Sequence, residues 1–243
     1  MDLRLIDIPV ASPAEHLALD EALLESVEKD GAPDTLRIWE SEVPFVVLGT
    51  AQRVQEEVDT TACAELGVPI LRRCSAGGCV LQGPGSLNFA LSLRYAGRRE
   101  LSVLHDSYCF ILKRLSGAFA DLGITACHAG ISDMTLDGYK ISGNAQRRKR
   151  DTFLHHGTLL YALQEDLMAR CIREPADRPA YRGERKHIDF VRPLPLDHST
   201  LRGAVLAAFD CEDKPQALTP FEVSAMEQLA ATRYSDDEWT HRR

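Results

Sequence analysis

The clearest strand pattern in the chain lies in residues 71–95, which read LRRCSAGGCVLQGPGSLNFALSLRY. Near its end, apolar residues occupy every second position, which is the period of a half-buried β-strand. The apolar positions are Leu87, Phe89, Leu91 and Leu93, and the opposite face carries Asn88, Ala90 and Ser92. We therefore predict a sheet strand that begins just after the glycine-rich part of this stretch.

Glycines precede the predicted strand and lie close to an arginine. Arg73 is followed by Gly77 and Gly78, and Gly85 ends a Gly-Pro-Gly turn. Glycine lets backbone N–H groups approach a ligand closely, and arginine supplies fixed positive charge. The combination suits an anionic group such as a phosphate or an acyl-phosphate; a tight hairpin with turn glycines is the alternative. The spacing matches neither the nucleotide P-loop nor the dinucleotide-binding fingerprint.

A second informative stretch covers residues 130–161, GISDMTLDGYKISGNAQRRKRDTFLHHGTLLY. Asp137-Gly138 is a strong signal for a two-residue hairpin turn between strands expected over 131–136 and 139–142, which places Lys140 at the start of the second strand. Backbone pairing would hold this lysine in a fixed position, as is needed to place a cation against a reacting carbonyl. A lone lysine is usually solvated. The adjacent histidines, His155 and His156, must point to opposite faces of a strand, and we expect His156 to be packed and hydrogen-bonded.

Together, the two stretches resemble the lipoate–protein ligase family, which forms a wider group with octanoyltransferases and biotin–protein ligases. The family motifs Arg-Arg-x-Ser-Gly-Gly-Gly-Ala, Lys-(Ile/Val)-Ser-Gly-x-Ala and His-His-Gly-Thr-Leu-Leu correspond here to residues 72–79, 140–145 and 155–160. The resemblance implies an α+β fold in which a mixed, largely antiparallel sheet is flanked by helices. It further implies a single catalytic domain over residues 1–243 without the small accessory domain of two-domain ligases. A separate small protein could supply that domain.

The resemblance implies an activity that attaches a lipoyl or octanoyl group to a lysine of an acceptor protein. The substrates would be lipoate and ATP with Mg²⁺, joined as an acyl-adenylate before transfer. The acceptor would be a lipoyl domain, either a 2-oxoacid dehydrogenase E2 or a glycine-cleavage H-like protein. The family's essential lysine falls on Lys140, and Arg73 with the amides near Gly77 and Gly78 would cradle the phosphate. The apolar face of the central strands would line the acyl tunnel.

The resemblance implies further site residues. Asp133 matches a position near the nucleotide and is the one candidate contact for Mg²⁺, although no protein-built metal site is predicted. Gln52, in a Gly-x-x-Gln segment, is a weak candidate near the acyl pocket and is equally well explained as a loop residue. The remaining predicted substrate- and nucleotide-binding residues are Ser75, Ala76, Cys79, Gly85, Asn88, Ser142, Gly143, Ala145, His156, Gly157 and Thr158.

Departures from the ligase pattern keep two other functions open. Ala76 replaces the first motif glycine, Cys79 replaces an alanine, and Gly83-Pro84-Gly85 is closer to the octanoyltransferase pattern. The main alternative is therefore transfer of an acyl group from a carrier protein through a cysteine thioester, without ATP. Cysteine-dependent transferases place that nucleophile elsewhere, and Cys127 is three residues early for one such position. A non-catalytic protein that binds lipoyl domains is the other alternative.

Composition excludes several classes of function. The chain has 28 basic and 36 acidic residues, and its net charge of −8 argues against non-specific nucleic-acid binding. Its seven cysteines are odd in number and lack CxxC spacing, which favours reduced thiols in the cytoplasm. The charged N-terminus does not resemble a signal peptide, and no apolar run reaches the ~18–20 residues of a membrane span.

Other predicted elements follow from capping and periodicity. We expect a core-facing helix from the capping box at Ser12, strands over 35–40 and 45–49, and helices over 57–66 and 102–122. We predict a strand over 68–73 and another over 153–161. The basic run 146–150 is predicted to be a solvated turn, residues 173–196 a long surface loop, and Thr219–Glu222 the capped start of a final helix.

Overall fold

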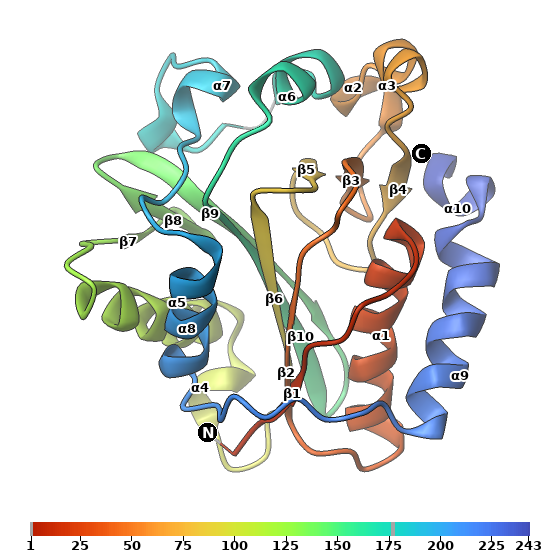
Figure 1. The fold of residues 1–243 in the computed structure, drawn as a ribbon, viewed down its shortest axis with the longest axis vertical. Helices are drawn as coiled ribbons and strands as arrows, with labels where there is room; N and C mark the ends of the chain where they lie inside the picture. Colours follow the sequence, from red (N-terminus) through yellow and green to blue (C-terminus); the bar gives the residue numbers. More distant parts are fainter. Residues whose placement is uncertain (1, 176–177) are drawn as a thin grey trace.

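The structure, a computed structural model, describes residues 2–175 and 178–243. A seven-stranded sheet has the order β1-β2-β6-β10-β9-β8-β7, and a three-stranded sheet has the order β4-β3-β5 (Figure 1). Among the described strands, β1–β2 and β3–β4 pair in parallel and the other pairs are antiparallel. The strands are β1 (Arg4–Ile6), β2 (Thr35–Trp39), β3 (Phe45–Leu48), β4 (Ile70–Arg72), β5 (Val80–Gln82), β6 (Ser86–Arg94), β7 (Cys127–Ala129), β8 (Asp133–Leu136), β9 (Tyr139–Arg148) and β10 (Thr152–Leu160). The predicted α+β fold is confirmed.

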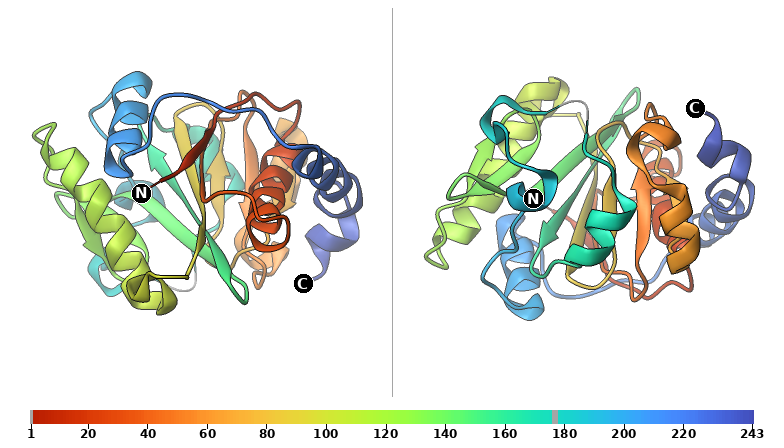
Figure 2. Two further views of the ribbon diagram at one scale, coloured as in Figure 1. Left: turned by 90° about the horizontal axis from the view of Figure 1, so that it is seen from below. Right: turned by 90° about the horizontal axis from the view of Figure 1, so that it is seen from above.

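Helices cover both faces of the large sheet (Figure 2). The helices are α1 (Pro13–Lys29), α2 (Val54–Glu57), α3 (Thr60–Leu66), α4 (Arg99–Ser102), α5 (Leu104–Ala120), α6 (Glu165–Cys171), α7 (His187–Phe190), α8 (His198–Ala208), α9 (Pro220–Leu229) and α10 (Asp237–His241), with the 3₁₀ turn η1 (Ala180–Arg182) and the π turn η2 (Ala230–Tyr234). No helix within the ranges 2–175 and 178–243 combines the length and the apolar composition needed to cross a membrane.

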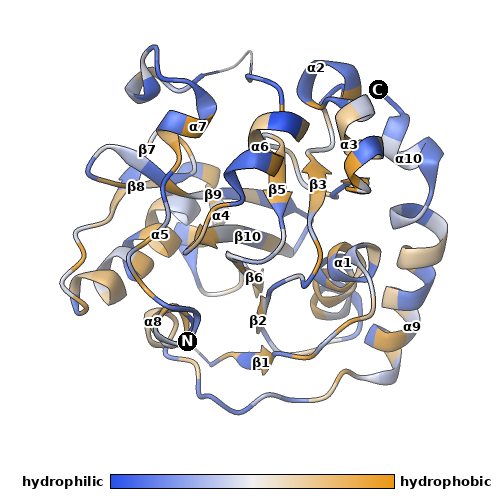
Figure 3. Ribbon diagram, turned by 45° about the horizontal axis from the view of Figure 1, so that its top comes forward, coloured by the Kyte–Doolittle hydropathy of each residue, from blue (hydrophilic) through white to orange (hydrophobic). Residues whose placement is uncertain are grey.

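Strand β6 has the predicted alternation, and its apolar face packs into the main core. Leu87, Phe89, Leu91 and Leu93 share that core with residues of α5 and α8. The opposite face of β6 packs against α1, which also contacts β10. The short strand β3 is hydrophobic along its length, and β5 is hydrophobic up to its polar last residue, Gln82 (Figure 3). Both faces of β6 are therefore covered, although they differ in polarity.

Helix α1 begins where its capping residues predict. Ser12 Oγ accepts a hydrogen bond from Glu15 N, with Pro13 at the first helical position. The apolar residues expected to face the core are buried, and so are Asp20 and Glu21. Glu21 is buried because η2 packs on the side of α1 that faces away from the sheet, where Arg233 and Tyr234 donate to its carboxylate. Asp20 faces the sheet instead, and its carboxylate accepts from Arg37 of β2. The capping box that starts α9, between Thr219 and Glu222, is also confirmed.

Four predicted element boundaries are wrong, for local reasons. The helix expected over 57–66 begins later, at Thr60, because Val58 is extended and Asp59 caps α3, while Glu57 ends the separate helix α2. The helix expected over 102–122 is broken at Val103, whose extended backbone separates α4 from α5. The strand expected over 68–73 is shorter, spanning Ile70–Arg72. The hairpin strand predicted to end at residue 142 continues to Arg148 because it pairs with β10 along its length.

Two predicted solvent-exposed segments are partly buried. Residues 146–148 of the basic run belong to β9, and Arg148 donates to Leu101 O and Ser102 O rather than lying in a solvated turn. The segment expected to be a surface loop over 173–196 contains η1 and α7, and it buries Arg182, Phe190 and Leu194. Its aromatic and aliphatic residues pack against neighbouring elements; residues 176 and 177 lie outside the described residues.

Two histidines are buried in their neutral form. Burial lowers the pKa of His155 to about 3, with a contribution from His156. Burial and the charge of Arg37 lower the pKa of His16 to about 3 against the opposing charge of Asp20. A histidine in the unfolded chain has a pKa near 6.5. Between that pH and about pH 3, the unfolded state therefore binds a proton that the folded state does not bind. The free energy of unfolding therefore falls as pH drops through that window.

We expect each of these two histidines to contribute a slope of up to about 1.4 kcal/mol per pH unit. Urea unfolding at pH 7, 6 and 5 measures the slope. His155→Gln should reduce it, whereas the exposed His241→Gln should leave it unchanged. Equal stability at pH 7 and pH 5 would show that the buried rings accept a proton without penalty.

Candidate acyl-transfer site

A pocket lies between the polar face of the large sheet and the loop that follows β4. Its lining residues are Leu17, Asp20, Trp39, Val47, Arg73, Gly77, Gly78, Cys79, Val80, Gln82, Asn88, Ser132, Asp133, Lys140, Gly143, Asn144, Ala145, His156, Gly157 and Thr158. Residues from the amino-terminal helix, both sheets and the β8–β9 hairpin therefore meet here. The two sequence stretches that carry the family resemblance form opposite walls.

The pocket does not use the predicted face of β6. The apolar face of that strand lies in the core, so the expected acyl tunnel along it is wrong. Instead, Asn88 faces the pocket, where it exchanges hydrogen bonds with Gln82. Thr158 Oγ1 accepts from Gln82 and donates to Asn88 Oδ1. Apolar lining comes from other elements: Leu17 of α1, Trp39 of β2, Val47 of β3 and Val80 of β5. The cavity is thus apolar on one side and amide-lined on the other.

Arg73 holds the shape of the loop that covers the pocket. Its guanidinium is buried and donates to Ala76 O at 2.7 Å, Gly78 O at 2.9 Å and Ser75 Oγ at 3.0 Å. Burial lowers its pKa to about 10, so the group stays charged at neutral pH. Gly77 has φ +98°, and a Cβ there would lie 2.9 Å from Arg73 Nη2. The arginine therefore fixes a loop that requires glycine.

The loop beside the pocket carries two backbone N–H groups without a protein partner among the described residues. These are the amides of Gly77 and Gly78, and both glycines line the pocket. Consecutive free N–H groups of this kind form a concave site that favours anions. The donors available to an anionic group are thus those of the loop backbone, while the donors of Arg73 are engaged within the loop.

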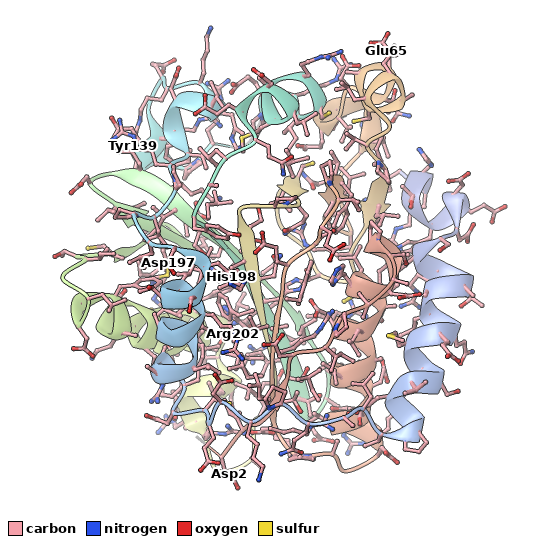
Figure 4. All side chains as sticks on the ribbon, in the orientation of Figure 1. Asp2, Glu65, Tyr139, Asp197, His198 and Arg202 are labelled. Atoms are coloured by element: carbon pink, nitrogen blue, oxygen red, sulfur yellow. The ribbon has the colours of Figure 1, made fainter. Side chains whose placement is uncertain are left out.

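Lys140 lies opposite this loop on the predicted hairpin. Asp137 and Gly138 have φ of +52° and +77°, as the predicted two-residue turn requires, and Tyr139 lies beside α7 (Figure 4). Lys140 Nζ is 2.8 Å from Asp133 Oδ1, with the two side chains 26% and 14% exposed. A Cβ at position 143 would lie 3.1 Å from Nζ, so Gly143 makes room for the lysine. The ammonium group is thereby placed at the pocket wall.

The arrangement around Asp133 does not fit a metal ion held by the protein. Oδ1 of Asp133 is paired with Lys140, and Oδ2 accepts a hydrogen bond from Tyr181 at 2.6 Å. In the described part of the chain, no group of three or more His, Cys, Asp or Glu side chains could hold a metal. Asp133 is therefore engaged by protein groups rather than left as a ligand for magnesium.

His156 occupies the pocket as part of a buried chain of polar groups. It faces the pocket while His155 is fully buried on the other face, as predicted. His156 Nδ1 is 3.2 Å from Asp20 Oδ2, and Nε2 is 2.6 Å from Ser75 Oγ. Burial would raise the pKa of Asp20, but Arg37 and His156 hold it below its usual value. The ionised Asp20 carboxylate accepts a hydrogen bond from His156 Nδ1–H, which leaves Nε2 to accept from the Ser75 hydroxyl.

Cysteines are poorly placed to act as nucleophiles. Cys79 lines the pocket, but burial raises the pKa of its thiol well above the ordinary value, against the attraction of Arg73. A buried, protonated thiol is a weak nucleophile. Cys127 is exposed on β7 and does not line the pocket.

Most predicted site residues meet in the pocket, and five do not line it. Ser75 Oγ lies within hydrogen-bond distance of His156 Nε2 without lining the pocket itself. The backbone carbonyl of Ala76, an exposed residue of the loop, accepts a hydrogen bond from the Arg73 guanidinium. Gly85 forms a turn in which its N–H donates to Glu40, and Ser142 accepts from Asn144. Gln52 Oε1 accepts from Gly49 N and stabilises a loop. Lining residues absent from the prediction are Leu17, Asp20, Trp39, Val47, Val80, Gln82, Ser132 and Asn144.

Comparison with known proteins agrees with this geometry. Residues 12–209 match the family model described as the lipoyl protein ligase A/B catalytic domain. The chain is 33% identical to the octanoyltransferase LipM of Carboxydothermus hydrogenoformans over 70% of this chain and 69% of that protein. It is 27% identical to LipM of Geobacillus kaustophilus over 99% of this chain and 98% of that protein.

Solved structures show the same fold. The lipoic acid-bound protein Ta0514 of Thermoplasma acidophilum, a suggested lipoate protein ligase, superimposes with a TM-score of 0.84 at 20% identity, over 100% of both chains. Lipoate-protein ligase A bound with ATP superimposes with a TM-score of 0.84 at 21% identity, over 99% of both chains. The chain belongs to the lipoyl protein ligase A/B catalytic domain family.

Proposed function

We propose that this protein transfers a lipoyl or octanoyl group to the side chain of a lysine on an acceptor protein. The observation that carries the proposal is Lys140, fixed on β9 by Asp133 and aimed at a pocket whose other wall presents free backbone amides. Acyl transfer develops negative charge on the carbonyl oxygen, and a preorganised cation and N–H donors stabilise that charge. Apolar residues on the remaining wall suit a hydrocarbon chain.

This geometry favours a reaction in which ATP activates the acyl group. The carboxylate oxygen of lipoate or octanoate attacks the α-phosphate, and pyrophosphate leaves. The acceptor amine then attacks the acyl carbon, AMP leaves, and the amine releases a proton. Amides of Gly77 and Gly78 would hold the phosphate, and Lys140 would donate to the acyl carbonyl. No step is assigned to a protein-held magnesium ion, because Asp133 is already engaged.

A second candidate reaction uses a cysteine thioester, and the relatives named octanoyltransferase LipM favour it. A cysteine thiolate would attack the thioester of an acyl carrier, and the carrier thiol would leave. The acceptor lysine amine would then attack the enzyme thioester, the cysteine thiolate would leave, and the amine would release a proton. Cys79 is the cysteine in the pocket, and its raised pKa disfavours this role. We therefore rank the ATP-dependent reaction first.

The acceptor in this proposal is a lipoyl domain of the E2 or H-protein kind. One structural neighbour is titled as a bi-partite lipoate protein ligase and its E2 lipoyl domain from Thermoplasma acidophilum. For this chain, such an acceptor and a separate accessory protein are proposals, as is action in the cytoplasm. Neither nucleic acid nor a membrane is assigned a role in the reaction.

Two measurements separate the candidate reactions. Purified protein is incubated with lipoate and Mg-ATP, with an acceptor domain, and pyrophosphate is measured with and without lipoate. We expect lipoate-dependent release and an acceptor mass increased by one lipoyl group, unchanged in Cys79→Ala and Cys127→Ala. If octanoyl-carrier protein instead gives a cysteine-linked octanoyl adduct on the enzyme, the ATP-dependent reaction is wrong. If the acceptor binds but neither reaction occurs, a non-catalytic binding protein remains.

A further inference from the structure

Tyr181 contacts the Lys140–Asp133 pair from a segment remote in sequence. Its hydroxyl donates to Asp133 Oδ2 at 2.6 Å, while Lys140 Nζ occupies Oδ1 at 2.8 Å. Burial, followed by the hydrogen bond to Asp133, raises the pKa of the Tyr181 phenol above its usual value, so the group remains a donor. Each oxygen of the carboxylate therefore has its own partner, and the lysine faces one oxygen.

The segment that carries Tyr181 is anchored to the strand that carries Lys140. Arg192 N donates to Lys140 O at 2.9 Å, and Arg185 Nη1 donates to Gly138 O in the hairpin turn. Arg185 also donates to Tyr181 O at 2.7 Å, and the Tyr181 ring packs on Phe190 at 5.3 Å between centroids. These contacts hold the phenol in place from both ends of the segment.

We propose that Tyr181 is a positioning residue for the acyl transfer described above. By occupying one oxygen of Asp133, it limits the carboxylate to a single contact with the Lys140 ammonium. The ammonium has three N–H donors, so the remaining ones can point into the pocket toward the acyl carbonyl. Without the phenol, both carboxylate oxygens would be available to the lysine and would draw it away from the substrate. This inference rests on the proposed function, and it adds a residue that does not itself line the pocket.

Tyr181→Phe removes the hydroxyl and keeps the ring on Phe190. We expect kcat for acyl transfer to fall roughly 10-fold, as for loss of a hydrogen bond to a charged group, with little change in KM for lipoate because the pocket walls are intact. The control is Tyr161→Phe, which removes a hydroxyl that donates to the Glu40 carboxylate outside the pocket and should leave kcat unchanged. Thermal unfolding of each variant checks that the fold is retained.

A double-mutant cycle distinguishes positioning from a structural role. If Tyr181 acts through Asp133, Tyr181→Phe should have little further effect on kcat in an Asp133→Asn background, because coupled residues are not additive. Full additivity of the two changes would overturn the proposal, as would a kcat of Tyr181→Phe equal to that of the wild type.

A readout independent of turnover separates this inference from the proposed function. The rate at which N-hydroxysuccinimide acetate labels Lys140 is followed by peptide mass spectrometry. We expect slower labelling in Tyr181→Phe and wild-type labelling in Tyr161→Phe, because only the first change gives Lys140 both carboxylate oxygens. If the wild type transfers no acyl group but labelling responds as expected, the proposed function fails and the positioning role stands. Unchanged labelling in Tyr181→Phe refutes the positioning role.

Discussion

Lys140→Ala should lower the rate of acyl transfer by about 10²- to 10³-fold, which is the usual effect of removing one donor that stabilises a developing oxyanion. The lysine is held by Asp133 on a paired strand, so its position is set before substrate binds. Single-turnover transfer of the lipoyl group to the acceptor domain measures the effect directly. Binding of lipoate should change much less, because the apolar wall of the pocket is untouched.

Two comparison variants sharpen this result. Lys113→Ala removes an exposed lysine of α5 and should leave transfer unchanged. Lys140→Arg keeps the charge but replaces a compact ammonium with a planar guanidinium, and the narrow space beside Gly143 should prevent it from restoring the rate. Wild-type transfer by Lys140→Ala would remove the central residue of the proposed mechanism.

The features predicted from sequence are those with local signals. The alternation from Leu87 to Leu93 identifies β6, and Asp137-Gly138 identifies the turn before Lys140, because each pattern is determined by residues a few positions apart. The motifs around Gly77 and His156 predicted two groups of site residues, and both groups line the same pocket.

The features that were missed depend on contacts between distant segments. Alternation reveals that β6 has two faces, but not that α5 and α8 cover the apolar one while the pocket forms on the other. Asp20 reaches the pocket only because α1 packs across β2 and β10, whose Arg37 and His156 contact its carboxylate. Tyr181 reaches Asp133 across 48 positions. No periodicity or spacing along the chain contains this information.

Asp20 forms a buried ion pair with Arg37 beside the site. Of the substitutions considered, replacing Asp20 should lower the free energy of unfolding the most. Arg37 Nη1 donates to Asp20 Oδ1 at 2.6 Å and to His16 O at 2.7 Å, with the two side chains of the pair 0% and 2% exposed. Asp20→Ala leaves the Arg37 charge buried and unpaired. Breaking such a pair by removing one partner typically costs about 3–5 kcal/mol, which corresponds to a fall in Tm of roughly 10 °C for a chain of this length.

The ion-pair prediction is tested by comparing a single, a double and a surface variant. Because Asp20 has a pKa below its ordinary 3.8, the stabilisation it provides is present at pH 7 and pH 5 and is lost only as pH falls through the folded-state value. The double variant Asp20→Leu with Arg37→Met should recover much of the loss, since a well-packed apolar pair can replace a buried ion pair. Asp213→Ala, which removes an exposed partner of Arg202, should leave Tm nearly unchanged. If Asp20→Ala is as stable as Asp213→Ala, the buried charge of Arg37 has another partner, and the hydrogen-bonded chain to His156 does not depend on Asp20.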